Sequence, residues 1–220
     1  MDDKPLQTKL RYYGISPWEI EVLYGILSDK FTVVQEETGD PLVGNLPMNH
    51  VEDDQNLVSA LIITIPVQFS EEFFQWFGFK RWEKVKSIIK EMKRRRGNRK
   101  AILVVIKFEN GEWYTTPMGK KTPDDEDPII YSNDERLPDY PHVKFTVDSS
   151  ENHIFNSAIE KIDVMVELLP YHLNHSKMKE FCKKPMVIRY EYDIVLSKWY
   201  VGYVLTLDGG RTFGIDSLRG

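Results

Sequence analysis

The longest apolar stretches of the chain are residues 57–67 (LVSALIITIPV) and 101–108 (AILVVIKF), which are almost continuously apolar and rich in β-branched side chains. Runs of this kind are typical of strands that are covered on both faces of a sheet. Between them, a serine followed by two glutamates predicts the start of a helix over residues 70–78, and an amphipathic pattern predicts a second helix over residues 80–96. This order predicts a parallel strand pair joined by a right-handed crossover.

The residues before this unit predict one helix, one strand and a long loop. Ser16 and Glu19 match a capping box, with proline at the first helical position between them, and they predict a helix over residues 16–29. A short β-branched run predicts a strand at residues 31–35. Residues 38–56 contain several glycines, prolines, asparagines and aspartates, which favours a loop.

The chain after the central unit alternates between turn signals and periodic segments. An Asn-Gly pair at 110–111 is typical of a type I′ turn, so residues 101–116 are predicted to form a β hairpin at the edge of the central unit. Further elements are predicted in the order of a strand at 143–147, a helix over 151–169 that ends at Pro170, and a short helix over 176–183.

The last 36 residues change to an alternating pattern, with VIRYEYDIV and WYVGYVLTL separated by the turn Ser197-Lys198. This pattern predicts an antiparallel meander with one polar face. The expected fold class is therefore α+β, with a mixed β-sheet and helices, a central strand-helix-strand unit and a C-terminal antiparallel meander. Residues 1–220 are expected to form a single α+β domain, and the loop over 117–142 is where it would divide.

The composition is that of an ordinary folded protein. Hydrophobic residues make up 41% of the 220 residues, which is ample for a packed core. The chain has no run of about 18 apolar residues, and its first ten residues fit neither a signal peptide nor a transit peptide. Cys182 is the only cysteine, which excludes an internal disulfide and a multi-cysteine zinc site. We therefore expect a cytoplasmic protein without membrane contact; no cofactor is indicated, and the oligomeric state is left open.

Charge is strongly segregated along the chain, although the net charge is only -5. Residues 80–107 hold 12 lysines and arginines against two carboxylates, Glu83 and Glu91. Residues 124–139 hold seven carboxylates against a single arginine, Arg136. These two segments are expected to face each other or to face different partners.

The basic excess is concentrated at the C-terminal end of the helix predicted over residues 80–96. One or two cations offset the helix dipole, whose effect fades within a turn, so the surplus requires an acidic partner. Because the cluster precedes strand 101–108, it is expected at the amino end of that strand, away from the usual ligand crevice. We therefore predict a non-enzymatic intracellular binding or regulatory protein whose residues 80–100 contact DNA, RNA or an acidic protein surface. The candidate contact residues are Lys86, Lys90, Lys93, Arg94, Arg95, Arg96, Arg99 and Lys100.

Clustered carboxylates support two alternative hypotheses. Glu160 and Asp163 share one face of a predicted helix, and Glu191 and Asp193 share the polar face of a predicted strand. Two such acidic groups can bind Mg²⁺ for phosphodiester cleavage, so a metal-dependent nuclease or phosphoester hydrolase is the second hypothesis. The third hypothesis is an interaction protein that neutralises a partner with the acidic loop 124–139.

Two histidines, His172 and His175, lie three residues apart and precede Cys182. Histidines at this spacing on a helix can share a metal ion. However, the neighbouring Pro170 and Asn174 indicate a turn, and a structural zinc site needs four ligands. No metal site is therefore predicted.

Residues 206–213 (TLDGGRTF) resemble an Asp-box, the hairpin-turn element of sialidases and other β-propellers. The chain holds this motif once, and a propeller needs many more strands. What the resemblance implies here is a turn in which Asp208 accepts backbone N–H bonds and Gly209 and Gly210 supply positive φ angles.

Overall fold

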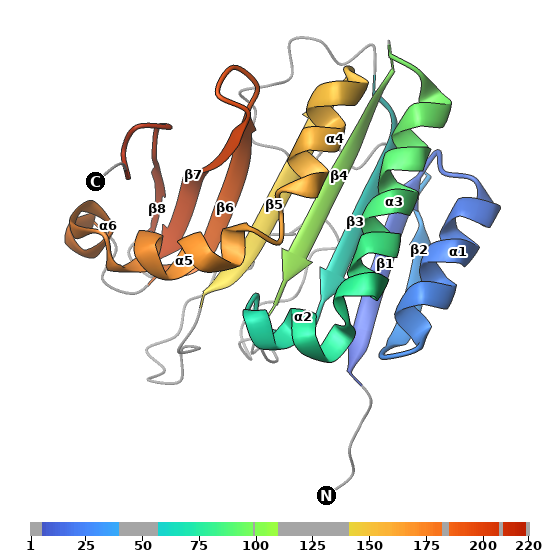
Figure 1. The fold of residues 1–220 in the computed structure, drawn as a ribbon, viewed down its shortest axis with the longest axis horizontal. Helices are drawn as coiled ribbons and strands as arrows, with labels where there is room; N and C mark the ends of the chain where they lie inside the picture. The colour runs from blue at the N-terminus through green and yellow to red at the C-terminus, as the bar shows by residue number, and fades with distance from the viewer. Residues whose placement is uncertain are drawn as a thin grey trace, which may run out of the picture.

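The computed structural model describes residues 6–39, 57–98, 100–109, 141–181, 185–206 and 209–218. Its helices lie over one face of a single mixed sheet (Figure 1). The helices are α1 (Pro17–Ser28), α2 (Glu71–Phe77), α3 (Phe79–Arg96), α4 (Asn152–Glu160), α5 (Met165–Asn174) and α6 (Ser176–Phe181). The strands are β1 (Gln7–Tyr13), β2 (Thr32–Glu37), β3 (Leu57–Ile65), β4 (Ala101–Phe108), β5 (His142–Ser149), β6 (Pro185–Asp193), β7 (Lys198–Thr206) and β8 (Gly209–Thr212).

The eight strands follow the order β2-β1-β3-β4-β5-β6-β7-β8. Three successive strand-helix-strand units each close with a parallel pair, β1 with β2, β3 with β4 and β5 with β6. Neighbouring units meet in antiparallel pairs, and β7 and β8 extend the sheet as an antiparallel meander. This architecture confirms the α+β class, the mixed sheet, the central strand-helix-strand unit and the C-terminal meander.

The direction of each unit decides which strand ends share an edge of the sheet. Because β1 runs antiparallel to β3, its carboxyl end lies beside the amino ends of β3 and β4. The carboxyl end of β5 lies at this same edge, since β5 runs antiparallel to β4. This edge therefore carries carboxyl ends as well as amino ends.

The central strands β3 and β4 are covered on both faces, as their apolar runs predict. Leu61 and Ile63 belong to the main core beneath the helices. The intervening Ala60 and Ile62 point to the opposite face and belong to a second buried cluster with Leu103 and Val105 of β4. Burial on both faces explains why these runs show no alternation of apolar and polar residues.

Helix α1 begins as its capping box predicts. The side chain of Ser16 accepts a bond from the backbone N–H of Glu19, and the Glu19 carboxylate accepts one from the backbone N–H of Ser16. Helix α3 buries the predicted apolar stripe of Trp82, Val85, Ile89 and Met92 against the sheet, each at most 1% exposed.

Two local expectations are wrong, and one strand was not predicted. Residues 101–108 are not one arm of an edge hairpin, because β4 is paired with β3 on one side and β5 on the other. The helix expected over 151–169 is broken into α4 and α5 by the turn at residues 161–164, and Pro170 lies inside α5. Strand β1 was not anticipated, since its seven residues alternate only weakly. The Asn-Gly pair at 110–111 lies outside the described residues.

The Asp-box resemblance is confirmed as a hairpin between β7 and β8, and Asp208 lies outside the described residues. Gly209 has a φ of 118°, as expected. Gly210 does not have a positive φ angle; a Cβ there would lie 1.8 Å from the hydroxyl oxygen of Tyr203, so a larger residue would require the Tyr203 side chain to move.

No helix in the described part of the chain is long and apolar enough to cross a membrane.

Candidate anion-binding surface

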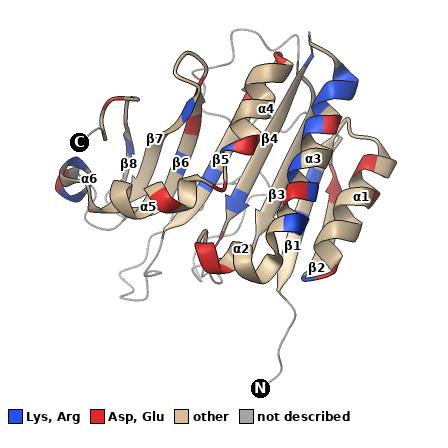
Figure 2. Cartoon of the chain, viewed as in Figure 1, with Lys and Arg blue, Asp and Glu red and all other residues tan. Residues whose placement is uncertain are grey.

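Helix α3 carries nearly all of the candidate contact residues and lies between α1 and α4 (Figure 1). Lysines and arginines occur along its whole length and fill its last turn (Figure 2). The structure divides these cations into a buried or partly buried group, which joins α3 to its neighbours, and an exposed group at the end of the helix.

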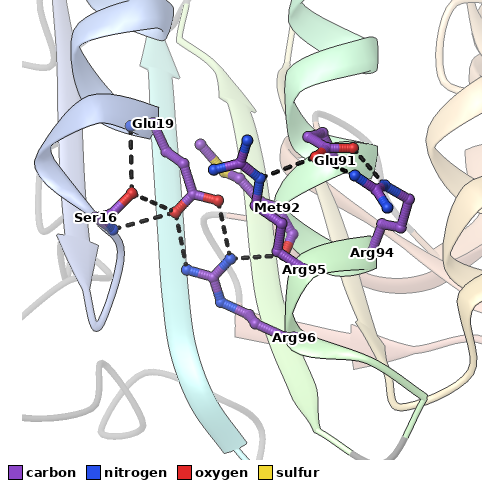
Figure 3. Close-up of polar contacts among 7 residues, drawn as sticks. All are labelled: Ser16, Glu19, Glu91, Met92, Arg94, Arg95 and Arg96. Atoms are coloured by element: carbon purple, nitrogen blue, oxygen red, sulfur yellow. Dashed lines mark hydrogen bonds and ion pairs between the residues drawn. The ribbon is translucent and has the colours of Figure 1, made fainter.

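Arg96 is partly buried and joins α3 to α1 and the sheet, and its side chain is 11% exposed. Its Nε donates to the Ser59 hydroxyl, and its Nη atoms donate to both carboxylate oxygens of Glu19 and to the carbonyls of Gly14 and Met92. A guanidinium has five N–H groups, so all of them have an acceptor. Arg96 therefore has no donor left for a partner. Figure 3 shows its bonds to Glu19 and Met92.

Glu19 is the buried carboxylate that this arginine neutralises, and its side chain is 4% exposed. Burial raises the pKa of Glu19, but hydrogen bonds from Arg96 and Ser16 outweigh burial and lower the pKa below its ordinary value. Glu19 therefore stays ionised and serves two purposes, as the capping residue of α1 and as the counterion of Arg96.

Lys93 is fully buried and joins the end of α3 to the connection between β5 and α4 in the third unit. Its Nζ donates to the carbonyls of Gly97, Lys100 and Ser150 at 2.6, 3.0 and 2.7 Å. These three bonds use every donor of an ammonium group. Burial lowers the pKa of Lys93, and the neighbouring charge of Arg96 lowers it further.

Lys86 and Lys90 face α4 and the turn after it. The Nζ of Lys86 lies 2.6 Å from Glu83, 3.2 Å from Asp163 and 3.3 Å from Glu160. Lys90 forms an ion pair with Glu160 as well. Burial lowers the pKa of Lys86, but the hydrogen bond to Glu83 and the charge of Asp163 outweigh it and raise the pKa overall. This polar contact joins α3 to α4.

Arg94 and Arg95 are exposed and share the carboxylate of Glu91, one turn back on the same helix (Figure 3). Their side chains are 71% and 45% exposed. Hydrogen bonds from the two arginines lower the pKa of Glu91 to about 2. The guanidinium of Arg95 also lies over the ring of Trp18 in α1, with Cζ 4.5 Å from the ring centroid. One carboxylate thus faces two arginines.

Lys100 is exposed just before β4, and no ion pair to it occurs among the residues that the structure describes. Lys80 and Lys84 are exposed on the outer side of α3 and likewise have no ion pair within the described ranges. Arg99 lies outside the described residues. The exposed cations at the end of α3 are therefore Arg94, Arg95 and Lys100, which we call the exposed triad.

An open cleft of about 430 Å³ lies beside the exposed triad. It forms where β1 ends and α1 begins, at the edge that also carries the amino ends of β3 and β4. The expectation that the basic cluster lies away from the carboxyl ends of strands is therefore wrong, because β1 and β5 run in the opposite direction to β4. The cleft is lined by Gly14, Ser16, Glu19, Ser59, Arg95, Arg96 and Lys100.

Three of the residues around the cleft were not anticipated as site residues. Gly14 accepts a bond from the Ser59 hydroxyl at 2.8 Å, which fixes the end of β1 against the start of β3. The ring of Trp18 packs against the guanidinium of Arg95. The serine near the start of the apolar run LVSALIITI was a visible signal for Ser59, since a buried polar side chain needs partners.

The carboxylates of the nuclease hypothesis form two pairs in different parts of the fold, at or just after the end of α4 and on β6, and all have protein partners. Glu160 and Asp163 bind the lysines of α3. Glu191 accepts a bond from the Tyr200 hydroxyl, and Asp193 accepts the backbone N–H of Leu196. Within the described ranges, no three carboxylate, histidine or cysteine side chains come close enough to hold a metal ion.

The two histidines of the predicted turn are not adjacent ligands of one ion. His172 is hydrogen bonded to the hydroxyl of the buried Tyr190 at 2.8 Å, and burial lowers the pKa of His172 to about 4. His175 accepts the backbone N–H of Lys177. Cys182 and the acidic loop 124–139 lie outside the described residues.

Comparison with known proteins gave no match to any protein family, and no curated protein or solved structure is significantly similar to the chain.

Proposed function

We infer that this chain is a non-enzymatic intracellular binding or regulatory protein whose exposed triad contacts an acidic segment of a protein partner. The observation that carries this proposal is the imbalance at the end of α3. Arg94 and Arg95 share one carboxylate, and Lys100 has none among the described residues. Exposed cations that remain unneutralised attract anionic partners and speed their association.

The arrangement of charge on α3 favours an acidic protein over nucleic acid. A nucleic-acid surface needs a continuous excess of cations along the phosphate backbone. Here the exposed side of α3 carries the carboxylates Glu83 and Glu91 among its cations, and Arg96 and Lys93 are already committed to internal bonds. Arg94 and Arg95 of the exposed triad share Glu91, and Arg95 and Lys100 line one cleft, which suits a short acidic segment.

The proposal is tested by measuring the affinity of a labelled poly-glutamate peptide by fluorescence anisotropy. The triple variant Arg94→Gln, Arg95→Gln and Lys100→Gln removes the exposed triad. If each surface ion pair contributes about 0.5 kcal/mol, the affinity should fall by about tenfold. Raising the salt from low to physiological concentration should weaken the wild-type complex and have little effect on the variant.

A matched control removes three exposed lysines outside α3, namely Lys9, Lys177 and Lys179, each changed to Gln. This control changes the net charge equally, so it should reduce the affinity by less than about twofold if contact is local. An equal loss in both variants, or no binding by the wild type at low salt, would refute the proposal. Tighter binding of single-stranded DNA than of a peptide of equal charge would assign the surface to nucleic acid instead.

A further inference from the structure

The cleft beside the exposed triad has a neutral floor and a positive rim. Its floor is the ion pair of Glu19 and Arg96, in which the carboxylate and the guanidinium neutralise each other. Its rim carries Arg95 and Lys100, and no further carboxylate belongs to the described lining. An anionic group in the cleft therefore meets two cations, Arg95, which shares the single carboxylate of Glu91 with Arg94, and Lys100, which has no ion pair among the described residues.

Arg95 is held in place before any ligand arrives. Its Nε donates to Glu91 at 2.9 Å, and its Cζ lies 4.5 Å from the centre of the Trp18 ring. These contacts leave both Nη atoms without a hydrogen bond among the described residues. A guanidinium fixed in this way loses little conformational entropy on binding and presents two parallel donors to an oxyanion.

The geometry of the donors favours a phosphate monoester over a carboxylate. A phosphorylated side chain carries a charge of about -1.5 to -2 at neutral pH and three acceptor oxygens, which matches two cations with several free N–H groups. The cleft volume of about 430 Å³ exceeds that of a phosphate group and leaves room for the side chain that carries it. A single carboxylate would neutralise only one of the two cations.

We propose that the cleft binds a phosphorylated side chain within the acidic segment of the partner, with Arg95 as the bidentate ligand of the phosphate and Lys100 as its second cation. This inference rests on the proposed function, because it assumes that the exposed triad contacts an acidic segment. It adds that the contact is switched by phosphorylation, since the modified side chain supplies the second negative charge.

The test uses three versions of one glutamate-rich peptide, with a central serine, phosphoserine or glutamate, and measures the affinity of each for the full chain by anisotropy. The phosphoserine peptide should bind about tenfold tighter than the serine peptide, and the glutamate peptide should lie between them. The Arg95→Gln and Lys100→Gln variants should lower this preference to less than about twofold. Lys84 lies on the same helix but away from the cleft, so Lys84→Gln should lower the affinity for all three peptides by the same factor.

Equal affinities for the serine and phosphoserine peptides would overturn the inference and leave the proposed function standing. An undiminished preference in both cleft variants would overturn it as well. Binding of none of the three peptides would refute the proposed function, and an NMR titration with inorganic phosphate then tests the cleft directly. Shifts confined to the surroundings of Arg95 and Lys100 are expected there, and their absence would refute the phosphate site.

Discussion

The two sets of cations at the C-terminal half of α3 come from one basic run but have opposite environments. Lys93 is buried and Arg96 is partly buried, and every donor on them has a protein acceptor. Arg94 and Arg95 lie between them in the sequence, are exposed, and share a single carboxylate. The helical period explains the difference, because residues 93 and 96 face neighbouring elements and residues 94 and 95 face outward. A run of like charges is therefore not one functional unit, and each position needs its own assignment.

Removing Arg96 is expected to have the largest effect on the difference between the internally bonded and the exposed cations of α3. The Arg96→Met variant leaves Glu19 buried without a counterion, and we expect it to lower the free energy of unfolding by about 3–5 kcal/mol. Urea unfolding followed by circular dichroism measures this loss. Replacing Glu19 by Leu in the same chain should recover part of it, since no buried charge then remains. A loss of less than about 1 kcal/mol in Arg96→Met would show that Arg96 is not a structural tie.

Lys93 tests whether a buried lysine can be structural without any carboxylate. Lys93→Met leaves the carbonyls of Gly97, Lys100 and Ser150 without their donor. We expect the free energy of unfolding to fall by about 2–4 kcal/mol, because unsatisfied buried carbonyls are costly. Lys84→Met is the matched control on the exposed side and should change stability by less than about 0.5 kcal/mol. Similar values for the two variants would contradict the assignment.

Mild acid should leave both sets of cations charged and act instead on two histidines, the buried His142 and the partly buried His172. Burial lowers the pKa of His142 to about 3 and that of His172 to about 4, below the unfolded value of about 6.5. Between pH 6.5 and the lowered pKa values of the folded state, the unfolded chain binds more protons than the folded chain. The stabilising contribution of the two neutral histidines is therefore present above pH 6.5 and is lost as the pH falls below it. We expect a loss of about 1–2 kcal/mol for each histidine between pH 7 and pH 5.

Unfolding midpoints measured across this pH range check the prediction. His172→Gln should flatten the pH dependence by about half, because one of the two titrating groups is then absent. A pH profile that stays the same in this variant would assign the acid sensitivity to other groups.

The smallest stability effect is expected for Arg94, which defines the exposed side of the comparison. Arg94→Gln removes one exposed ion pair with Glu91, and Arg95 keeps its bond to the same carboxylate. We expect the free energy of unfolding to change by less than about 0.5 kcal/mol, as is usual for exposed pairs. A loss above about 1.5 kcal/mol in urea unfolding would place Arg94 with the buried cations.

The sequence allowed the secondary structure to be predicted where local physics decides it. The capping box at Ser16 and Glu19 marks the start of α1 regardless of its surroundings, and the apolar runs of β3 and β4 follow from burial on both faces. Strand β1 was missed because its sequence, QTKLRYY, mixes charged and aromatic residues and does not alternate clearly between apolar and polar positions. Its two neighbours, β2 and β3, provide the stabilisation that the local pattern does not show.

The candidate site was harder to predict, because the burial and the hydrogen-bond partners of each cation depend on residues far away in the chain. The partner of Arg96 is 77 positions earlier, and the Ser150 carbonyl that binds Lys93 is 57 positions later. The amphipathic pattern of α3 placed Lys86 and Lys93 on a polar face, but nothing local indicates that α4 covers that face. The direction of β1, which brings the cleft to the basic cluster, is likewise a property of strand pairing.

The bonds of Lys93 and Lys86 to the third unit also have a consequence during protein synthesis. The ribosome completes α3 long before it makes Ser150, Glu160 and Asp163, which supply acceptors for these two lysines. Until then, two cations that end up buried lack these partners, and keeping them hydrated is cheaper than burying them. We expect the first two units to remain loosely joined on the nascent chain, and α3 to lock into place only when the third unit emerges.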